Sequence, residues 1–312
     1  MGFYQPAQIV ADAAKHGVEV RPVDINHSCW DNSLEELAGN YCALRLGFRQ
    51  VKGLKADDMG ILIACRGDGY PTIAALRSTA ISQAALERLA DADAFRSIGL
   101  DRRQALWEVA GKDRPVALFK GEKNNEQSVD LPVMAIGEHV VQDYATMALS
   151  LKAHPVSFVR EKLDQLHVCP AARLSTLKDG MQIRVAGLVL VRQRPGTAGG
   201  VCFMTVEDET GTANLVIFEN LFERFRKEIL QSRLIMAEGR LQIEGEVIHV
   251  VVHRAYDFSR LLRTLTSGPR ANPAALTLSY PDEGTHSPLQ VKKARTRERT
   301  DEKIFPDARN FK

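Results

Sequence analysis

The sequence predicts an α+β protein of several domains, in which helical segments come first, a five-stranded β-barrel follows and a basic tail comes last. Three observations support this fold class. Residues 54–113 hold a series of short helical runs joined by small-residue turns. Residues 180–258 hold five strand-like runs and one helical run. From residue 259 onward the chain becomes basic, and beyond Ser267 it is rich in Pro, Gly, Ser and Thr, which is typical of disordered chain.

The first segment, residues 1–53, mixes helix and strand. It begins with PAQIVADAAKHG, where Ile9, Val10 and Ala13 share a helical face and Gly17 is suited to a C-cap. The stretch VEVRPVDIN reads as a short strand or an extended segment. The stretch LEELAGNYCALRLGFRQVKGL reads as a helix-like run followed by a short strand.

The second segment, residues 54–113, predicts a tandem helix-hairpin-helix. Ser82 and Asp101 are expected to cap two of its helices. In such units the backbone N–H groups of each hairpin point at a DNA phosphate. Ordinary solvated charge is the alternative reading. The candidate DNA contacts are Lys52, Gly53 and Lys55 at the first hairpin, and Arg96, Ser97, Gly99, Arg102 and Arg103 at the second.

Residues 114–130 predict an exposed linker, because they are polar and lack periodicity. Residues 131–179 predict a helical connector of two helices that are interrupted near Pro155, since proline cannot continue a helix.

Residues 180–258 predict an OB-fold. The runs, in order, are MQIRVAGLVLVRQR, VCFMTVED, TANLVIF, the helical ENLFERFRKEIL, SRLIMAEGRLQIE and EVIHVVVHR. Three strands, a helix and two strands is the order of this small Greek-key barrel, whose exposed face commonly binds single-stranded nucleic acid. Aromatic and basic side chains suit that role, although the two aromatics could instead fill the barrel core. The candidate single-strand contacts are Arg184, Arg192, Arg194, Phe203 and Phe218.

Charge is unevenly distributed along the chain. From Arg260 to Lys312 there are 11 Lys and Arg against 6 Asp and Glu, whereas the rest carries 30 against 33. A basic tail over residues 259–312 attracts polyanions without sequence preference, although a merely solvated end would look the same.

Bulk properties exclude several classes of protein. The 312 residues suffice for two or three domains, and 45% hydrophobic residues are ordinary for a globular protein. No apolar run is long enough to span a membrane, and the first residues do not resemble a signal peptide, so we expect a cytoplasmic protein without membrane partners. The five cysteines are scattered, which predicts neither a zinc site nor disulfides.

Longer strings carry a specific resemblance. They are GFYQPAQIVADAAKHGVEVRPVDIN, ALRLGFRQVKGL, ALERLADADAFRSIGLDRRQALW, LSLKAHPVSF and RVAGLVLVRQRPGTAGGVCFMTVEDETGTANLVIF. Over about residues 1–262, and in this order, they closely resemble the C-terminal portion of bacterial C-family DNA polymerases. The similarity is greatest to the error-prone, damage-inducible branch.

The resemblance implies a different role for each segment of the chain. Residues 1–53 correspond to the late fingers, where Lys15, His16, Arg21 and Asn26 would line a DNA or nucleotide channel. The helix-hairpin-helix would grip primer–template duplex and the OB-fold would hold single-stranded template. The resemblance is also compatible with two further kinds of partner, namely other translesion-synthesis proteins and the sliding clamp.

Catalysis is expected to lie outside this sequence. The family holds Mg²⁺ with a P-D-x-D type motif in the palm, and no such motif occurs here, so we assign no catalytic residue, no metal site and no cofactor to this chain. Mg²⁺ is expected only in the full-length polymerase. A fragment, a truncated gene and a mis-called start are all consistent with this pattern.

One motif departs from the family. A hairpin of this type usually reads Gly-hydrophobic-Gly, but here it reads Gly53-Leu54-Lys55. Lys55 would then contact phosphate by charge. Two other readings stay open: a stand-alone single-strand-binding adaptor, and an enzyme with an appended OB-fold such as an aminoacyl-tRNA synthetase. The second is disfavoured, because the sequence has no ATP-binding or nucleophile motif.

Overall fold

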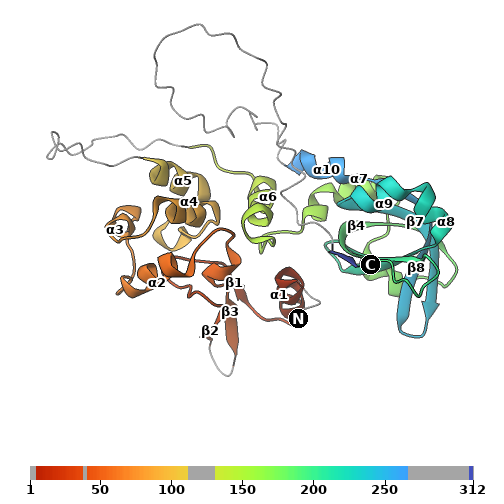
Figure 1. Ribbon diagram of the computed structural model, residues 1–312, viewed down its shortest axis with the longest axis horizontal. Helices are drawn as coiled ribbons and strands as arrows, with labels where there is room; N and C mark the ends of the chain where they lie inside the picture. The colour runs from red at the N-terminus through yellow and green to blue at the C-terminus, as the bar shows by residue number, and fades with distance from the viewer. Residues whose placement is uncertain (1–4, 38–40, 112–130, 266–308, 312) are drawn as a thin grey trace, which may run out of the picture. The chain divides into compact units, whose positions relative to one another are not determined.

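The computed structural model describes residues 5–37, 41–111, 131–265 and 309–311. The chain separates into two compact units, Met1–Lys152 and Ala153–Lys312 (Figure 1). The predicted linker at 114–130 and residues 266–308 of the predicted tail lie outside the described residues. No helix in the described ranges is both long and apolar enough to cross a lipid bilayer.

The first unit is mainly helical. Its order is α1 (Pro6–Lys15), β1 (Val20–Arg21), β2 (Ser33–Glu36), β3 (Cys42–Arg45), η1 (Phe48–Gln50), α2 (Ala56–Ala64), α3 (Ile73–Arg77), α4 (Gln83–Asp91), η2 (Arg96–Ile98), α5 (Arg102–Ala110) and α6 (Ile136–Met147). The expected caps are present: Ser82 accepts a hydrogen bond from the Ala85 N–H, and Asp101 accepts one from the Gln104 N–H. These local bonds explain where α4 and α5 begin.

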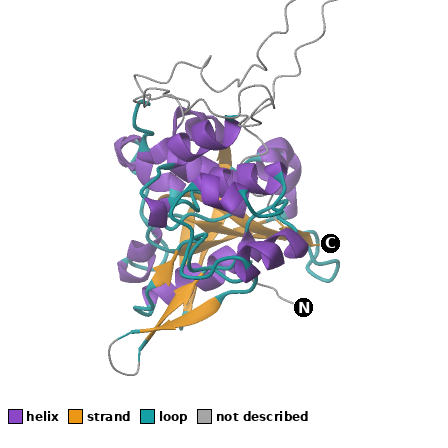
Figure 2. Ribbon diagram, turned by 90° about the vertical axis from the view of Figure 1, so that its left-hand side faces the viewer, coloured by secondary structure: helices purple, strands orange, loops and turns teal. Residues whose placement is uncertain are grey.

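The stretch from Leu34 to Arg45 corrects one expectation. The predicted short strand is present as β3, but the helix-like run before it is the strand β2, which pairs antiparallel with β3 (Figure 2). β1 pairs parallel on the other side of β3. Glu35 on β2 accepts hydrogen bonds from Arg45 Nε at 2.6 Å and from Arg21 Nη1 at 2.6 Å. These cross-strand ion pairs favour the sheet, because a helix would not bring the three side chains together.

A buried ion network joins two helices and a turn of this unit. The Arg102 guanidinium on α5 bonds to the Asp143 carboxylate on α6, and each side chain is 1% exposed. Arg102 Nη1 also donates to the His139 carbonyl at 2.9 Å. Lys152 Nζ lies 3.1 Å from Asp143 Oδ2 and 3.2 Å from Asp93 Oδ2, in the turn after α4. The network therefore fixes α5, α6 and that turn to one another.

The second unit contains a closed barrel. Its elements are η4 (Pro155–Val159), α7 (Arg160–Gln165), η5 (Ala171–Thr176), β4 (Gln182–Gln193), β5 (Cys202–Glu207), β6 (Thr212–Ile217), α8 (Glu219–Arg224), α9 (Arg226–Gln231), β7 (Leu234–Glu244), β8 (Val247–Asp257), α10 (Ser259–Leu262), η6 (Arg263–Leu265) and β9 (Arg309–Phe311). The strands pair in the order β4-β5-β6-β8-β7 and return to β4.

The barrel follows the predicted order with two differences. The helical run is two short helices that meet at Phe225 rather than one. In addition, β9 pairs parallel to β4 at Val191–Gln193, beside the point where the pairing of β4 with β7 has ended at Leu188. The inward faces hold a core that includes Met204, Ile217 and Leu241.

An arginine helps to attach the connector to the barrel. Arg160 at the start of α7 donates to Asp208 and Glu209, which lie in the turn between β5 and β6. Asp208 is 4% exposed and also accepts hydrogen bonds from the N–H groups of Ala171, Thr210 and Gly211. One buried carboxylate therefore orders both the turn and the segment before β4.

We expect Asp143→Asn to destabilise the first unit by about 3–5 kcal/mol, because it leaves the Arg102 charge buried without its acidic partner. The double variant Arg102→Met/Asp143→Leu should recover much of that loss. Urea unfolding followed by tryptophan fluorescence measures it, since both tryptophans, Trp30 and Trp107, lie in this unit. The control is Asp68→Asn, the same change at an exposed position. An equal loss of unfolding free energy in Asp143→Asn and Asp68→Asn would contradict the role of the buried pair.

We expect Glu35→Gln to destabilise the same unit in a pH-dependent way. The hydrogen bond from Arg45 holds the pKa of Glu35 at about 2, against an ordinary 4.5. A lowered pKa means that the stabilisation is complete above pH 4.5 and is lost as the pH falls towards 2. The variant should be less stable by roughly 1 kcal/mol at pH 7. The gap to the wild type should close from pH 4.5 downward, whereas the exposed neighbour in Glu36→Gln should show no such trend.

Candidate nucleic-acid interface

An apolar row crosses the outer face of the barrel. Phe203 on β5 pairs with Val216 on β6, Val216 pairs with Val251 on β8, and Val251 pairs with Arg240 on β7. Because these residues are register partners, their side chains stand side by side on the outside of the sheet. Phe203 is 41% exposed. The row offers one aromatic ring and two aliphatic side chains to solvent, with a cation at its end.

A polar row lies next to the apolar one. Thr205 pairs with Asn214, Asn214 with His249, and His249 with Gln242. Thr205 Oγ1 donates to Asn214 Oδ1 at 3.0 Å, and His249 Nε2 lies 3.1 Å from Gln242 Oε1. These groups provide donors and acceptors beside a platform on which a base can stack, which is the combination used to hold single strands.

The two phenylalanines predicted on this domain are both on the surface. Phe203 stands in the apolar row, and Phe218 is 54% exposed at the start of α8. The alternative that they fill the barrel core is therefore wrong. That position is taken by Phe222, which is buried and has the Arg194 guanidinium 4.4 Å from its ring centroid.

Arg192 is placed differently from our expectation. It is 6% exposed. Its Nε donates to the Ile229 carbonyl at 2.6 Å, and its Nη2 donates to the Ser232 carbonyl. The side chain thus binds the backbone at the end of α9, where a cation offsets the helix dipole. Arg192 therefore does not face a nucleic-acid strand bound on the surface of the barrel.

Arg184 and Arg194 are surface residues with acidic partners. Arg184 Nε donates to Glu238 at 2.7 Å and Nη1 to the Leu166 carbonyl at 2.9 Å. Arg194 lies 3.3 Å from Glu219 and 3.6 Å from Glu223. Both charges are therefore partly offset before any ligand arrives.

The first predicted hairpin has an exposed backbone. Gly53 has φ of +84°, a conformation that side-chain-bearing residues rarely adopt. Lys55 is exposed and stands before α2, whose first turn has no side-chain cap. Lys52 is directed elsewhere, since its Nζ donates to the Ala145 carbonyl at 3.0 Å near the end of α6. The Arg88 guanidinium lies near Gly53 and adds a cation that the sequence did not indicate.

The second predicted hairpin is only partly open. Gly99 is exposed with φ of +80°, and an added Cβ there would meet no atom within 4 Å. Arg96 Nε donates to Asp93 at 2.8 Å but keeps a 45% exposed side chain. Arg103 donates to the Pro132 carbonyl and to Glu138. Arg102, predicted as a DNA contact, is instead in the buried network, where no phosphate can reach it.

The predicted fingers residues do not form one cluster. Lys15 and His16 are exposed at the end of α1, and Arg21 is paired with Glu19 and Glu35. Asn26 lies elsewhere: its Nδ2 donates to Ser97 Oγ at 3.1 Å and its Oδ1 accepts from the Tyr70 N–H at 2.7 Å. The structure thus brings Asn26 to the second hairpin.

The sequence reading missed most of the outer face of the barrel. Val216, Val251 and Asn214 were not predicted as contacts, although alternation along β6 and along the first half of β8 places them outward. Alternation combined with register would have found them. Within the described ranges, no group of three or more His, Cys, Asp or Glu residues is arranged to hold a metal ion.

Two family models match the chain. The helix-hairpin-helix motif matches residues 17–105, and the OB-fold nucleic acid binding domain matches residues 176–257. These ranges include both hairpins and the whole barrel. The predicted order of a helix-hairpin-helix region and an OB-fold is therefore confirmed.

Curated relatives match over a longer range. An error-prone DNA polymerase from Sinorhizobium medicae is 49% identical over 293 residues, covering 85% of this chain and 26% of that protein. An error-prone DNA polymerase from Ruegeria pomeroyi is 43% identical over 318 residues, covering 100% of this chain and 28% of that protein. The chain is a relative of the error-prone DNA polymerases. It spans about a quarter of the length of these polymerases, and the resemblance seen in its sequence is confirmed.

Solved structures add little to this polymerase relationship. The asparaginyl-tRNA synthetase from Pyrococcus horikoshii is 25% identical over the matched part, covering 26% of this chain and 20% of its own, with a TM-score of 0.23. That score is too low to support an argument.

We expect Lys52→Met to lower the free energy of unfolding of the first unit by up to about 1 kcal/mol, because it removes a cation from the end of α6. Lys55→Met should stay within about 0.5 kcal/mol of the wild type, since that side chain is exposed. Urea unfolding by tryptophan fluorescence compares the two. A larger loss for Lys55→Met would show that the two lysines have been assigned the wrong roles.

Proposed function

We propose that this chain is the DNA-binding, C-terminal part of an error-prone, translesion DNA polymerase. The helix-hairpin-helix region holds primer–template duplex, and the barrel holds single-stranded template. The single observation that carries the proposal is the joint occurrence of both nucleic-acid-binding domains, in this order, within a sequence 43–49% identical to error-prone DNA polymerases.

The duplex contacts we propose are the exposed hairpin backbones and their nearby cations. Gly53 and Gly99 adopt positive φ values at exposed turns, which lets a phosphate approach the main chain closely. Lys55 and Arg88 lie at the first hairpin, and Arg96 keeps an exposed side chain at the second. Phosphate contacts of this kind position DNA without reading its sequence, which suits a polymerase.

The single-strand contacts we propose are the two rows on the barrel. Stacking on Phe203 accepts any base, because every base has a flat π face. The amide and imidazole groups of the polar row can bond to base edges without demanding one base. Arg240 at the end of the apolar row is placed to meet the backbone of the strand.

Nucleotide addition is proposed to depend on parts of the polymerase outside this sequence. The acidic motif that holds Mg²⁺ in the palm of the family has no counterpart in these 312 residues. The purified chain is expected to bind primer–template without extending it. Extension of a labelled primer by the chain alone would contradict this assignment. Binding to single strands with no preference for primer–template over them would instead favour the stand-alone adaptor.

We expect Phe203→Ala to weaken binding of single-stranded DNA by roughly 5- to 150-fold, since stacking on an aromatic ring contributes about 1–3 kcal/mol per base. Fluorescence anisotropy with a labelled oligothymidine at fixed salt measures the change. Phe158→Ala is the matched control, because Phe158 is 39% exposed in the same unit but lies outside both rows. Similar losses in the two variants, or none in either, would remove the support for the apolar row.

A further inference from the structure

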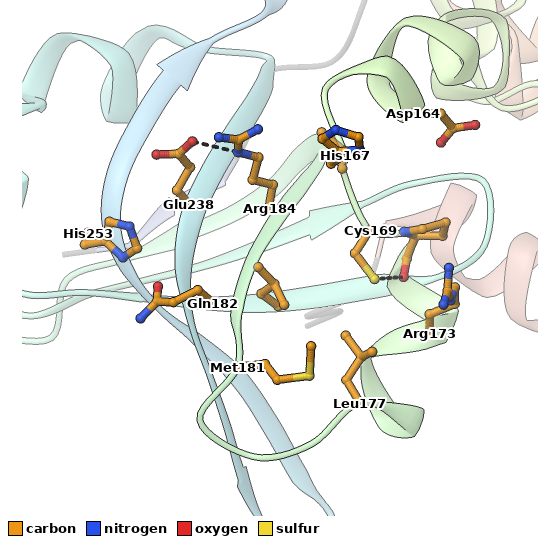
Figure 3. Close-up of a pocket in the computed structure, with 13 residues that line it drawn as sticks. Asp164, His167, Cys169, Arg173, Leu177, Met181, Gln182, Arg184, Glu238 and His253 are labelled. Atoms are coloured by element: carbon orange, nitrogen blue, oxygen red, sulfur yellow. Dashed lines mark hydrogen bonds and ion pairs between the residues drawn. The ribbon is translucent and has the colours of Figure 1, made fainter.

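A pocket of about 1000 Å³ opens on the barrel beside β4 (Figure 3). One wall is the outer surface of β4, β7 and β8, with Gln182, Arg184 and His253. The other wall is the segment that precedes β4, with Cys169 and Arg173. It has no part in the contacts proposed above, so its chemistry needs a separate explanation.

The pocket has an apolar surface. Val168, Leu177, Met181 and Ile183 all line it. Met181 is 41% exposed, although a methionine of a monomeric surface is more often covered. Burial raises the pKa of the Cys169 thiol, so this group is a neutral, weakly polar part of the wall. A flat apolar ligand can therefore displace water from this surface.

Three polar side chains face the pocket without a partner in the described ranges. No hydrogen bond or ion pair engages the side chains of Arg173, Gln182 or His253 there. Figure 3 shows Gln182 and His253 on one side of the pocket and Arg173 on the other. The three groups supply a permanent cation, an amide and an imidazole to whatever enters.

A β-bulge presents His253. Val252 on β8 pairs with Gly239 on β7, but Arg254 pairs with the preceding Glu238, so His253 is the extra residue. A Cβ at Gly239 would lie 2.5 Å from the Val251 carbonyl oxygen, so only glycine permits this close approach. The bulge thus directs the imidazole of His253 away from the sheet.

One acidic group of the pocket, Glu238, is already paired, whereas Asp164 is 59% exposed. Glu238 accepts from Arg184 Nε at 2.7 Å and from the Tyr256 hydroxyl at 3.4 Å. Asp164 lies 4.0 Å from Arg160. His167 adds a second imidazole at the upper end. Arg173 and Arg184 balance Asp164 and Glu238 in formal charge, but Arg173 forms no ion pair with either acid in the described ranges, so it can meet the anionic group of a ligand that also carries a flat apolar group.

The pocket is continuous with the proposed single-strand path. Gln182, on its wall, is the register partner of Arg240, and Arg240 is the register partner of Val251 in the apolar row. A strand that leaves the row at Arg240 therefore meets the pocket next. Nucleotides combine an anionic phosphate with a flat, largely apolar base.

We propose that this pocket binds one nucleotide of the single strand, with its base against Met181, the base edge at Gln182 and His253, and its phosphate at Arg173. The proposal rests on the single-strand function proposed for the barrel and adds an end subsite to it. The bound base is unstacked from its neighbours, which distinguishes this subsite from the platform at Phe203.

The test is an abasic scan by fluorescence anisotropy with the full chain. A labelled oligothymidine is compared with versions in which each position in turn lacks its base. We expect one position near an end to lower affinity about tenfold in the wild type. In Arg173→Ala/Gln182→Ala the intact oligonucleotide should bind about tenfold more weakly, and the penalty at that one position should disappear. The matched control is Arg226→Ala/Gln231→Ala, which removes an exposed Arg and Gln from α9.

Each outcome decides between the two proposals. If the pocket variant binds like the wild type while Phe203→Ala still weakens binding, the pocket is not a nucleotide subsite and the barrel function stands. A pocket that serves a protein partner would give that same result. If the wild type does not bind single strands at all, the barrel function and the pocket proposal are both wrong. If the pocket variant weakens binding no more than the α9 control does, the proposal is also overturned.

Discussion

Helix α6 is the support on which the first unit depends, and the buried pair between Arg102 and Asp143 is the interaction that attaches it. Arg102 opens α5, directly after the second hairpin, so the pair sets where that hairpin stands. The last turn of α6, next to Asp143, holds the first hairpin, because the Lys52 N–H donates to the Thr146 carbonyl at 2.9 Å and its side chain reaches Ala145. One helix therefore positions both candidate DNA-binding turns, and a buried ion pair that must be satisfied leaves it little freedom.

Two arginines of the second unit are likewise engaged by acceptors within the protein. Arg192 binds backbone carbonyls at the end of α9, and Arg160 binds the turn at Asp208. Both lie where a count of positive charge would suggest contact with nucleic acid. Since a buried guanidinium must find acceptors, such residues are fixed by the protein itself. Fewer arginines are available to DNA at the surface than the sequence suggests. In the proposed binding, base stacking on aromatic side chains and contacts from the protein backbone therefore contribute more.

The sequence predicted the features that short-range physics decides. Helix starts at Ser82 and Asp101 follow from local hydrogen bonds, and the order of the barrel strands follows from alternation and turns. Prediction from the sequence failed where residues far apart in the chain determine the local structure. The β2–β3 hairpin depends on Glu35 meeting Arg21 and Arg45, and the role of Arg102 depends on Asp143, 41 positions away. The rows on the barrel needed strand register, which no single strand reveals.

The register of the barrel has a consequence for the shape of what it can hold. Starting at Gln193, the partners run through Phe203, Val216, Val251 and Arg240 and return to β4 at Gln182, eleven positions before the start (193 less 182). This offset is the stagger that closing a sheet requires. A polymer laid along the row therefore advances like the thread of a screw, and its two ends leave at different heights. A flat ring of contacts would bring those ends into collision, whereas the spiral lets the polymer continue in both directions.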